Sequence, residues 1–364
     1  MIISRTPYRV SFFGGGTDYP AWYRHHGGAV LSATIDKYCY LTCRYLPPFF
    51  EHKYRVVWSV IENCRSIEEI KHPAVGKILQ YVGMDRGIEI HHDGDLPARS
   101  GMGSSSAFTV GFLHAMSGLL GRLTSQSQLA AEAIHVEQDL IGETVGSQDQ
   151  IFASYGGFNL IEFKRDGSFH VEPLTLPRER LEELNGSLML FYTGLRRTAS
   201  EVAASYVADI GARTKQLTRM RQMVDEGLKI LSDGGSLDRF GDLLDEAWQL
   251  KRSLSGAVSN SQVDEVYAEA KRGGARGGKL LGAGGGGFLL FYVPPGCQQQ
   301  VKERLRKLLW VPFRFDTGGS QIIFYSPQQD YAALDQARAK SPAPSSREAF
   351  PASGPGAQRK QTKA

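Results

Sequence analysis

The sequence predicts an α+β protein of two domains, because the two halves of the chain carry different patterns. In the first hundred residues, short segments rich in β-branched and aromatic side chains and bounded by turn residues predict strands at 2–13, 28–45, 54–61 and 87–92. The second half has apolar residues at helical spacing over 220–231 and 237–248. Strands and helices in this order are typical of an α+β layer structure.

The first half also contains helices. Helical patterns predict three of them, at 71–82, 104–120 and 124–141. Ser125 and Gln128 have the spacing of a capping box at the start of the third. Strand character returns around 156–163.

A charged segment at 178–185 reads as a short helix or a connector and marks the expected domain boundary. We therefore expect an N-terminal domain over 1–180 and a C-terminal domain over 186–330. In the second domain the pattern predicts a helix at 298–309 and strands at 188–193, 288–293, 311–315 and 321–325. Residues 338–364 are rich in Pro, Ser, Ala, Gly and Lys, which predicts a disordered tail.

Composition and charge exclude several classes of protein. No run of about 18 apolar residues predicts a membrane-spanning helix, and the first residues lack the features of a signal peptide. The net charge of +4 is carried by the segment from residue 340 onward, so the rest of the chain is close to neutral. A neutral body argues against a nucleic-acid partner.

Four cysteines occur, and they lack a second close pair or a His-x-His partner: Cys39, Cys43, Cys64 and Cys297. This spacing favours buried free thiols in a reducing compartment over a zinc site. We therefore expect a cytoplasmic location.

The most informative motif is the glycine- and serine-rich segment 97–107, which lies between a predicted strand and the helix predicted from Ser104. Glycines let the backbone approach an anion closely, and the free N–H groups and dipole of a helix start favour negative charge. The alternative is an ordinary serine-capped helix. A cap needs only one serine, however, whereas three follow Gly101-Met102-Gly103, so we interpret the segment as a phosphate-binding loop.

A second motif begins with Arg9 on the first predicted strand and continues through the glycines at 14–16 to Thr17 and Asp18. The strand delivers the arginine, and the turn presents the threonine and the aspartate. A tight turn with Asp18 as an N-cap is the alternative interpretation.

A third glycine cluster, at 282–287, precedes an apolar strand. Its glycine spacing matches the GxGxxG fingerprint of dinucleotide-binding proteins, but that fingerprint precedes a helix, whereas this segment precedes a strand. The segment 273–279 similarly resembles a P-loop, but Leu280 stands where a hydroxyl would hold magnesium. We reject both interpretations and expect a loop that lines a cleft.

Two carboxylates stand out by their surroundings. Glu137 falls on the apolar stripe of the helix predicted at 124–141, where a carboxylate is costly unless a cation or donors compensate it. Asp149 lies in the polar segment 146–150, which we expect to be a loop and which allows a general base. A structural salt bridge and a turn residue are the respective alternatives.

With these segments in this order, the chain resembles the GHMP kinase superfamily, which phosphorylates galactose, homoserine, mevalonate and related alcohols. The resemblance runs from about Arg5 to Tyr325. It implies an N-terminal domain like ribosomal protein S5 domain 2, a ferredoxin-like C-terminal domain and a site between them.

Within that superfamily the opening motif looks like that of galactokinases, but Gly15-Gly16 stand where those enzymes carry Glu-His. The sequence looks more like the D-glycero-D-manno-heptose 7-phosphate kinases of bacterial surface-polysaccharide synthesis. This implies ATP-dependent phosphorylation of the anomeric C1 hydroxyl of the heptose 7-phosphate. The alternatives are a kinase for fucose, mannose or galactose, a non-catalytic sugar-sensing regulator, and an ATP-dependent decarboxylase.

The resemblance also implies roles for individual residues, with ATP and Mg²⁺ as cofactors. Asp149 would act on the proton of the sugar hydroxyl, and Arg9 would offset charge on the transferred phosphoryl group. Ser105 and Glu137 would hold magnesium. The ATP phosphates would be bound by Gly101, Met102, Gly103, Ser104, Ser105 and Ser106, and the sugar by Gly16, Thr17, Asp18, Gly285 and Gly286.

A phosphorylated substrate also needs basic side chains. Arg196 and Arg197, just after the strand predicted at 188–193, are candidates for that role, with plain surface arginines as the alternative. We expect a small sugar phosphate as the binding partner, and the sequence leaves a homodimer open.

Overall fold

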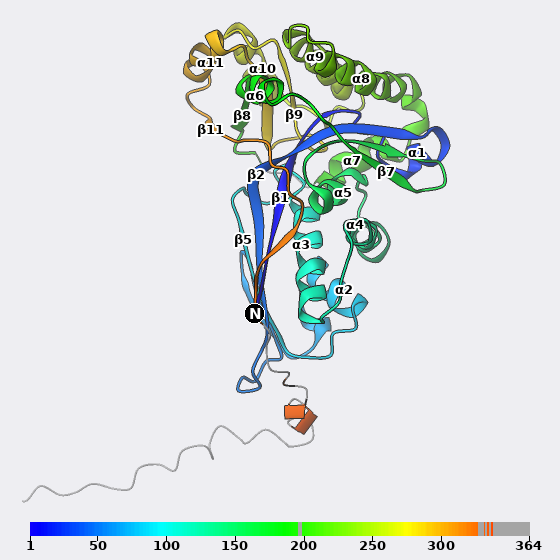
Figure 1. Ribbon diagram of the computed structural model, residues 1–364, viewed down its shortest axis with the longest axis vertical. Helices are drawn as coiled ribbons and strands as arrows, with labels where there is room; N and C mark the ends of the chain where they lie inside the picture. The colour runs from blue at the N-terminus through cyan, green and yellow to red at the C-terminus, as the bar shows by residue number, and fades with distance from the viewer. Residues whose placement is uncertain (196–198, 327–330, 332, 335, 338–364) are drawn as a thin grey trace, which may run out of the picture.

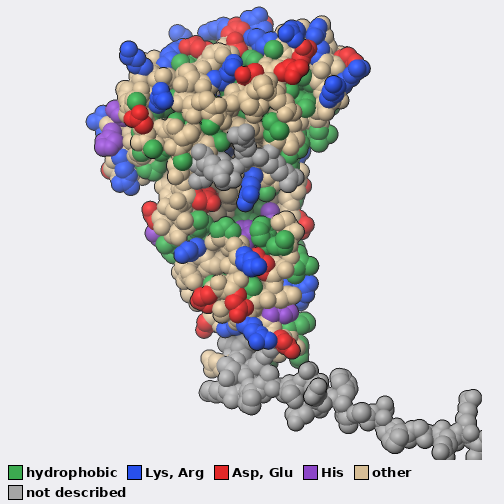
Figure 2. Space-filling model, turned by 180° about the vertical axis from the view of Figure 1, so that it is seen from behind, with side chains coloured by type: hydrophobic (Ala, Val, Ile, Leu, Met, Phe, Trp, Pro, Cys, Tyr) green, Lys and Arg blue, Asp and Glu red, His purple; other side chains and the backbone are tan. Residues whose placement is uncertain are grey.

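The computed structural model describes residues 1–195, 199–326, 331, 333–334 and 336–337. The predicted tail at 338–364 and the pair Arg196 and Arg197 lie outside the described residues. The chain forms a broad upper part and a narrower lower part (Figures 1 and 2), and it contains two β-sheets, of which the first extends from the lower part into the upper.

The first sheet has eight strands. Its main path runs in the order β12 (Gln321–Tyr325), β1 (Ile2–Phe13), β2 (Gly28–Tyr45), β5 (Ile88–Gly94), β3 (Tyr54–Val57) and β4 (Ile61–Cys64). The remaining two strands are β6 (Phe158–Phe163), which pairs with β2, and β7 (Phe169–Pro173), which pairs with β6. The long strand β2 pairs with β1 on one side, and on the other with β6 along its first half and β5 along its second.

Helices cover one face of this sheet (Figure 1): α2 (Pro73–Tyr81), α3 (Ser104–Leu119), α4 (Gln126–His135) and α5 (Gln148–Tyr155). Small residues let α3 approach the sheet closely, since a Cβ at Gly111 would lie 2.7 Å from Thr6 Oγ1. The helix predicted at 124–141 is divided: α4 gives way to a π-helical segment, Val136–Ile141, which carries Glu137.

The predicted cap of α4 is formed by Ser125, whose hydroxyl accepts a hydrogen bond of 3.1 Å from the Gln128 backbone N–H. The Gln128 side chain does not return to Ser125. It donates to Glu132 instead, so one half of the capping box is present.

The second sheet is antiparallel, in the order β11 (Leu309–Val311), β8 (Leu188–Tyr192), β10 (Phe288–Tyr292) and β9 (Gly277–Leu280). The helices of this upper part are α6 (Arg178–Gly186), α8 (Thr214–Ser232), α9 (Asp238–Arg252), α10 (Ser261–Arg272) and α11 (Gln298–Arg304). Two further helices are α1 (Pro20–His26) and α7 (Ala199–Val207). Short 3-10 turns lie at Ile67–Glu69, Ile210–Arg213 and Pro295–Cys297.

Several predicted elements differ from the structure. The strand expected at 54–61 is a hairpin of β3 and β4, and the strand expected at 311–315 is the shorter β11, with Phe315 only in an isolated bridge to Ile35. The strand at 321–325, which we placed in the second domain, pairs with β1 in the first sheet. The predicted domain bounds, 1–180 and 186–330, stay predictions.

The two parts meet where β1 ends. Helix α8 packs across β1 and β2, and a Cβ at Gly227 on this helix would lie 2.7 Å from the Phe13 ring. Phe12 and Phe13 are both buried and both contact the Phe240 ring on α9. This junction holds the polar side chains described next.

The predicted α+β class is confirmed. All four cysteines are free thiols, and Cys39, Cys43 and Cys64 are buried. Within the described residues, no helix combines the length and the apolar character needed to span a bilayer.

Candidate active site

The loop that precedes α3 has the backbone of an anion-binding nest. Arg99, Gly101 and Gly103 have φ angles of 59°, 80° and 76°, and no other residue between 99 and 103 has positive φ. Alternation of left-handed and ordinary backbone turns successive N–H groups toward one concave side, which binds anions. Gly103 is the N-cap of α3, and no side chain caps this helix. The serine-capped alternative is therefore wrong, and the helix start keeps donors for an anion.

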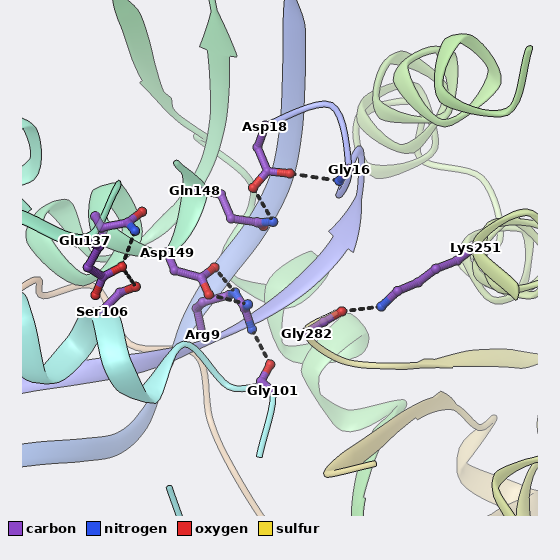
Figure 3. Close-up of polar contacts among 11 residues, drawn as sticks. Arg9, Gly16, Asp18, Gly101, Ser106, Glu137, Gln148, Asp149, Lys251 and Gly282 are labelled. Carbon is purple, nitrogen blue, oxygen red and sulfur yellow. Dashed lines mark hydrogen bonds and ion pairs between the residues drawn. The ribbon is translucent and has the colours of Figure 1, made fainter. Parts of the chain in front are cut away.

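Arg9 and Asp149 form an ion pair beside this loop (Figure 3). The guanidinium of Arg9, on β1, donates from Nε and Nη2 to both Asp149 carboxylate oxygens, each at 2.8 Å, and from Nη1 to the Gly101 carbonyl at 2.8 Å. The Arg9 side chain is 4% exposed, whereas that of Asp149 is 23% exposed. The arginine is thus a buried support, and the carboxylate remains open to a ligand.

Asp149 lies in the first turn of α5. The sequence had predicted a loop at this position. A Cβ at Gly103 would be 3.3 Å from Asp149 Oδ2, so the last glycine of the nest touches the carboxylate. An anion held at the start of α3 would consequently lie next to Asp149.

Glu137 is the second carboxylate at the site, and it is 1% exposed. Its Oε2 accepts hydrogen bonds from Ser106 Oγ, at 2.8 Å, and from the Gln150 amide, whereas its Oε1 has no hydrogen-bond partner among the described residues. Burial raises the pKa of Glu137 to about 7, against the opposing effect of the Ser106 hydrogen bond. A buried oxygen without a donor fits a cation ligand.

The pairing of Ser105 with Glu137 as magnesium ligands stays a prediction. Ser106, and not Ser105, contacts Glu137, and Ser105 is exposed in the first turn of α3. No cluster of three or more His, Cys, Asp or Glu side chains able to hold a metal ion occurs within the described part of the chain. A metal at Glu137 would therefore need oxygen ligands from the nucleotide as well.

The turn after β1 is fixed by Thr17 and Asp18. The Thr17 hydroxyl bonds to the Gly14 carbonyl at 2.8 Å and to both backbone groups of Ala29, and the side chain is fully buried. These hydrogen bonds hold the turn, and the predicted sugar contact of Thr17 stays a prediction.

Asp18 connects this turn to α5. One carboxylate oxygen accepts from the Gly16 backbone N–H at 2.8 Å, and the other accepts from Gln148 Nε2 at 3.0 Å (Figure 3). Burial raises the pKa of Asp18, and the nearby Asp149 charge adds to the effect. The predicted sugar contacts of Gly16 and Asp18 stay predictions.

The glycine loop at 282–287 lies directly against the phosphate-binding loop. A Cβ at Gly101 would lie 2.5 Å from the Leu281 carbonyl oxygen, and a Cβ at Gly282 would lie 2.4 Å from Gly101 Cα. Only glycines allow these two backbones to approach so closely. The predicted cleft-lining loop thus contacts the nest itself.

Gly285 and Gly286, which we expected to bind the sugar, are buried in the upper part. Gly285 donates its N–H to the Val258 carbonyl at 2.9 Å, and a Cβ at Gly286 would lie 2.7 Å from Leu195 Cβ. Both glycines pack the loop against the upper part, and their predicted sugar contacts stay predictions.

Two buried lysines were not identified from the sequence. Lys251 on α9 donates to the carbonyls of Leu280, at 2.9 Å, and Gly282, and Lys279 on β9 donates to the Phe12 carbonyl at 2.8 Å. Burial lowers the pKa of both amines, that of Lys279 to about 7, and the Arg9 charge adds to both shifts. The signal was available, because Lys251 follows Leu244 and Trp248 on one apolar helical stripe.

Replacing Lys279 with methionine is expected to change how stability depends on pH. The unfolded chain keeps this proton up to about pH 10.5, whereas the folded protein loses it near pH 7. Between these values the unfolded state binds more protons, so wild-type stability rises with pH. The free energy of unfolding of the wild type minus that of Lys279→Met should rise by up to about 1.4 kcal/mol per pH unit. Urea denaturation at several pH values measures it, with Lys215→Met, at an exposed lysine of α8, as the matched surface control.

Comparison with known proteins agrees with this geometry. Residues 68–157 match the GHMP kinases N terminal domain family, and residues 227–309 match the GHMP kinases C terminal family. The chain therefore contains the GHMP kinase N- and C-terminal domains, and it is an ATP-dependent phosphotransferase.

The chain is 28% identical over 330 residues to the D-glycero-alpha-D-manno-heptose 7-phosphate kinase of Campylobacter jejuni, across 84% of this chain and 93% of the relative. It is 28% identical over 316 residues to the bifunctional fucokinase/GDP-fucose pyrophosphorylase of Arabidopsis thaliana, across 78% of this chain and 29% of that protein. A crystal structure named as a D-glycero-D-manno-heptose 1-phosphate kinase of Bacteroides thetaiotaomicron superposes with a TM-score of 0.73 at 24% identity, covering 90% of this chain and 100% of that one. The similarity to the Bacteroides thetaiotaomicron structure shows that the two proteins share a fold.

Proposed function

We propose that this protein transfers the γ-phosphoryl group of ATP to the anomeric C1 hydroxyl of D-glycero-D-manno-heptose 7-phosphate. The product is the 1,7-bisphosphate, a precursor of nucleotide-activated heptose for bacterial surface polysaccharide. The Arg9–Asp149 pair beside the phosphate-binding nest carries the proposal for the chemistry. The near full-length match to the Campylobacter jejuni relative supports the choice of sugar.

The reaction needs little covalent chemistry from the protein, since phosphoryl transfer depends on positioning and on neutralising charge. Asp149 accepts or orients the proton of the acceptor hydroxyl. The oxygen of that hydroxyl forms a bond to the γ-phosphorus while the bond from the γ-phosphorus to ADP breaks. Arg9 holds both oxygens of that carboxylate in place. The backbone N–H groups at Gly101 and Gly103 bind phosphate oxygens.

Magnesium fits the residues present. Glu137 offers a buried oxygen with no hydrogen-bond partner among the described residues, and the Ser105 hydroxyl stands at the start of α3. When bound, the ion supplies positive charge that stabilises the phosphate oxygens.

An aromatic cluster near the nest supports a place for the adenine base. The ring of Phe108, one turn into α3, stacks on His72 with centroids 4.5 Å apart, and Trp58 meets His72 edge-on at 4.8 Å. His72 and Trp58 are partly exposed. Flat aromatic rings suit the face of a nucleobase.

Assays with matched acceptors test the substrate. The proposal expects turnover with D-glycero-D-manno-heptose 7-phosphate and a new phosphate at C1 by phosphorus NMR, with much weaker turnover of unphosphorylated heptose, fucose, mannose and galactose. Phosphorylation of heptose 1-phosphate would instead agree with the name of the Bacteroides neighbour and would contradict the proposed position. Turnover restricted to an unphosphorylated sugar would contradict the proposed substrate class.

A further inference from the structure

Arg99 adopts a backbone conformation that an arginine avoids. Its φ angle is 59°, and among the described residues it is the one non-glycine residue with positive φ. The left-handed region places Cβ too close to the following carbonyl oxygen, which costs stability in every residue except glycine. Residues held in such strained conformations cluster at active sites and ligand-binding sites.

The conformation is imposed by the loop. Arg99 is the first left-handed residue of the nest, followed by Gly101 and Gly103, and its backbone N–H donates to Ser104 Oγ at 3.3 Å. Glycine at residue 99 would give the same backbone without strain. The sequence keeps an arginine, so the side chain must contribute something that offsets the strain.

The Arg99 side chain is exposed at the rim of the nest. It has no ion pair with an acidic side chain in the part of the chain that the structure describes. A guanidinium thus stands without a carboxylate partner at the rim of the nest.

We propose that the guanidinium of Arg99 binds the triphosphate of the nucleotide directly, as a side-chain donor added to the backbone donors of the nest. Arginine is suited to this because its planar fork forms paired, charge-assisted hydrogen bonds to phosphate oxygens. The inference depends on the ATP-dependent phosphotransferase activity of the chain and is independent of which sugar is the acceptor.

Two substitutions test the proposal by measuring nucleotide affinity and thermal stability, which we expect to change in opposite directions. Arg99→Gly relieves the strained backbone and removes the charge, and Arg99→Asn removes the charge with a residue that tolerates positive φ. We expect both to weaken binding of a non-hydrolysable ATP analogue about tenfold or more, the scale of a lost charge-assisted hydrogen bond. Arg99→Gly should also raise the thermal unfolding midpoint. Arg99→Lys should retain part of the affinity, because it keeps the charge but loses the fork.

The control is Arg165→Asn, which removes an exposed arginine in the turn between β6 and β7. It should leave analogue binding unchanged. Binding within twofold of wild type in Arg99→Asn would overturn the proposal, and so would an unfolding midpoint of Arg99→Gly below that of wild type, because the argument from strain would then be wrong. Failure to phosphorylate heptose 7-phosphate would leave these binding results unaffected, so the two proposals fail separately.

Discussion

Replacing Asp149 with asparagine is expected to lower kcat by about a hundredfold or more, the usual size of a general-base effect. The amide cannot accept the hydroxyl proton, yet it keeps the shape of the side chain between Arg9 and Gly103. Nucleotide affinity, measured by calorimetry with a non-hydrolysable ATP analogue, should therefore remain within a few-fold of wild type.

Asp139→Asn is the matched control, because Asp139 is an exposed carboxylate on the π-helical segment and pairs with His135 instead. It should retain full activity. If Asp149→Asn turns over substrate at the wild-type rate, Asp149 is not the residue that acts on the acceptor hydroxyl, and the reaction must proceed without a base at this position.

Replacing Arg9 with methionine is expected to reduce both stability and activity. The substitution removes three hydrogen bonds and leaves the Asp149 carboxylate and the Gly101 carbonyl without their cation. Breaking a buried pair of this kind typically costs about 3–5 kcal/mol, measured here by urea denaturation. Loss of the group that holds the Asp149 carboxylate in place should lower kcat/KM by about a hundredfold or more.

The control is Arg5→Met on the same strand, where the guanidinium is only partly buried and donates to Gln321. It should cost little stability. In a double-mutant cycle, Arg9→Met combined with Asp149→Asn should destabilise by less than the sum of the single changes, with a coupling of about 0.5–3 kcal/mol. Additive effects would show that the two side chains do not support each other.

Local sequence signals were sufficient for many elements. The strands β1, β2, β8 and β10 and the helix α3 lie within a residue or two of their predicted bounds. In each of these elements the spacing of apolar residues follows a single strand or helix periodicity, and the residues that this spacing predicts to be buried are buried in the structure. Short elements were missed, including α5, because its polar start at Gln148 and Asp149 reads as a loop until packing buries the face that includes Phe152.

The sequence by itself determined the class of chemistry, because the nest depends on the glycines at 101 and 103, which can be identified from the sequence alone. Only the tertiary structure decided the partners. The pairing of Arg9 with Asp149, of Glu137 with Ser106 and of β12 with β1 joins residues far apart in the chain. Such contacts are set by how the sheets and helices pack, and hydrophobic periodicity carries no information about which distant polar groups then meet.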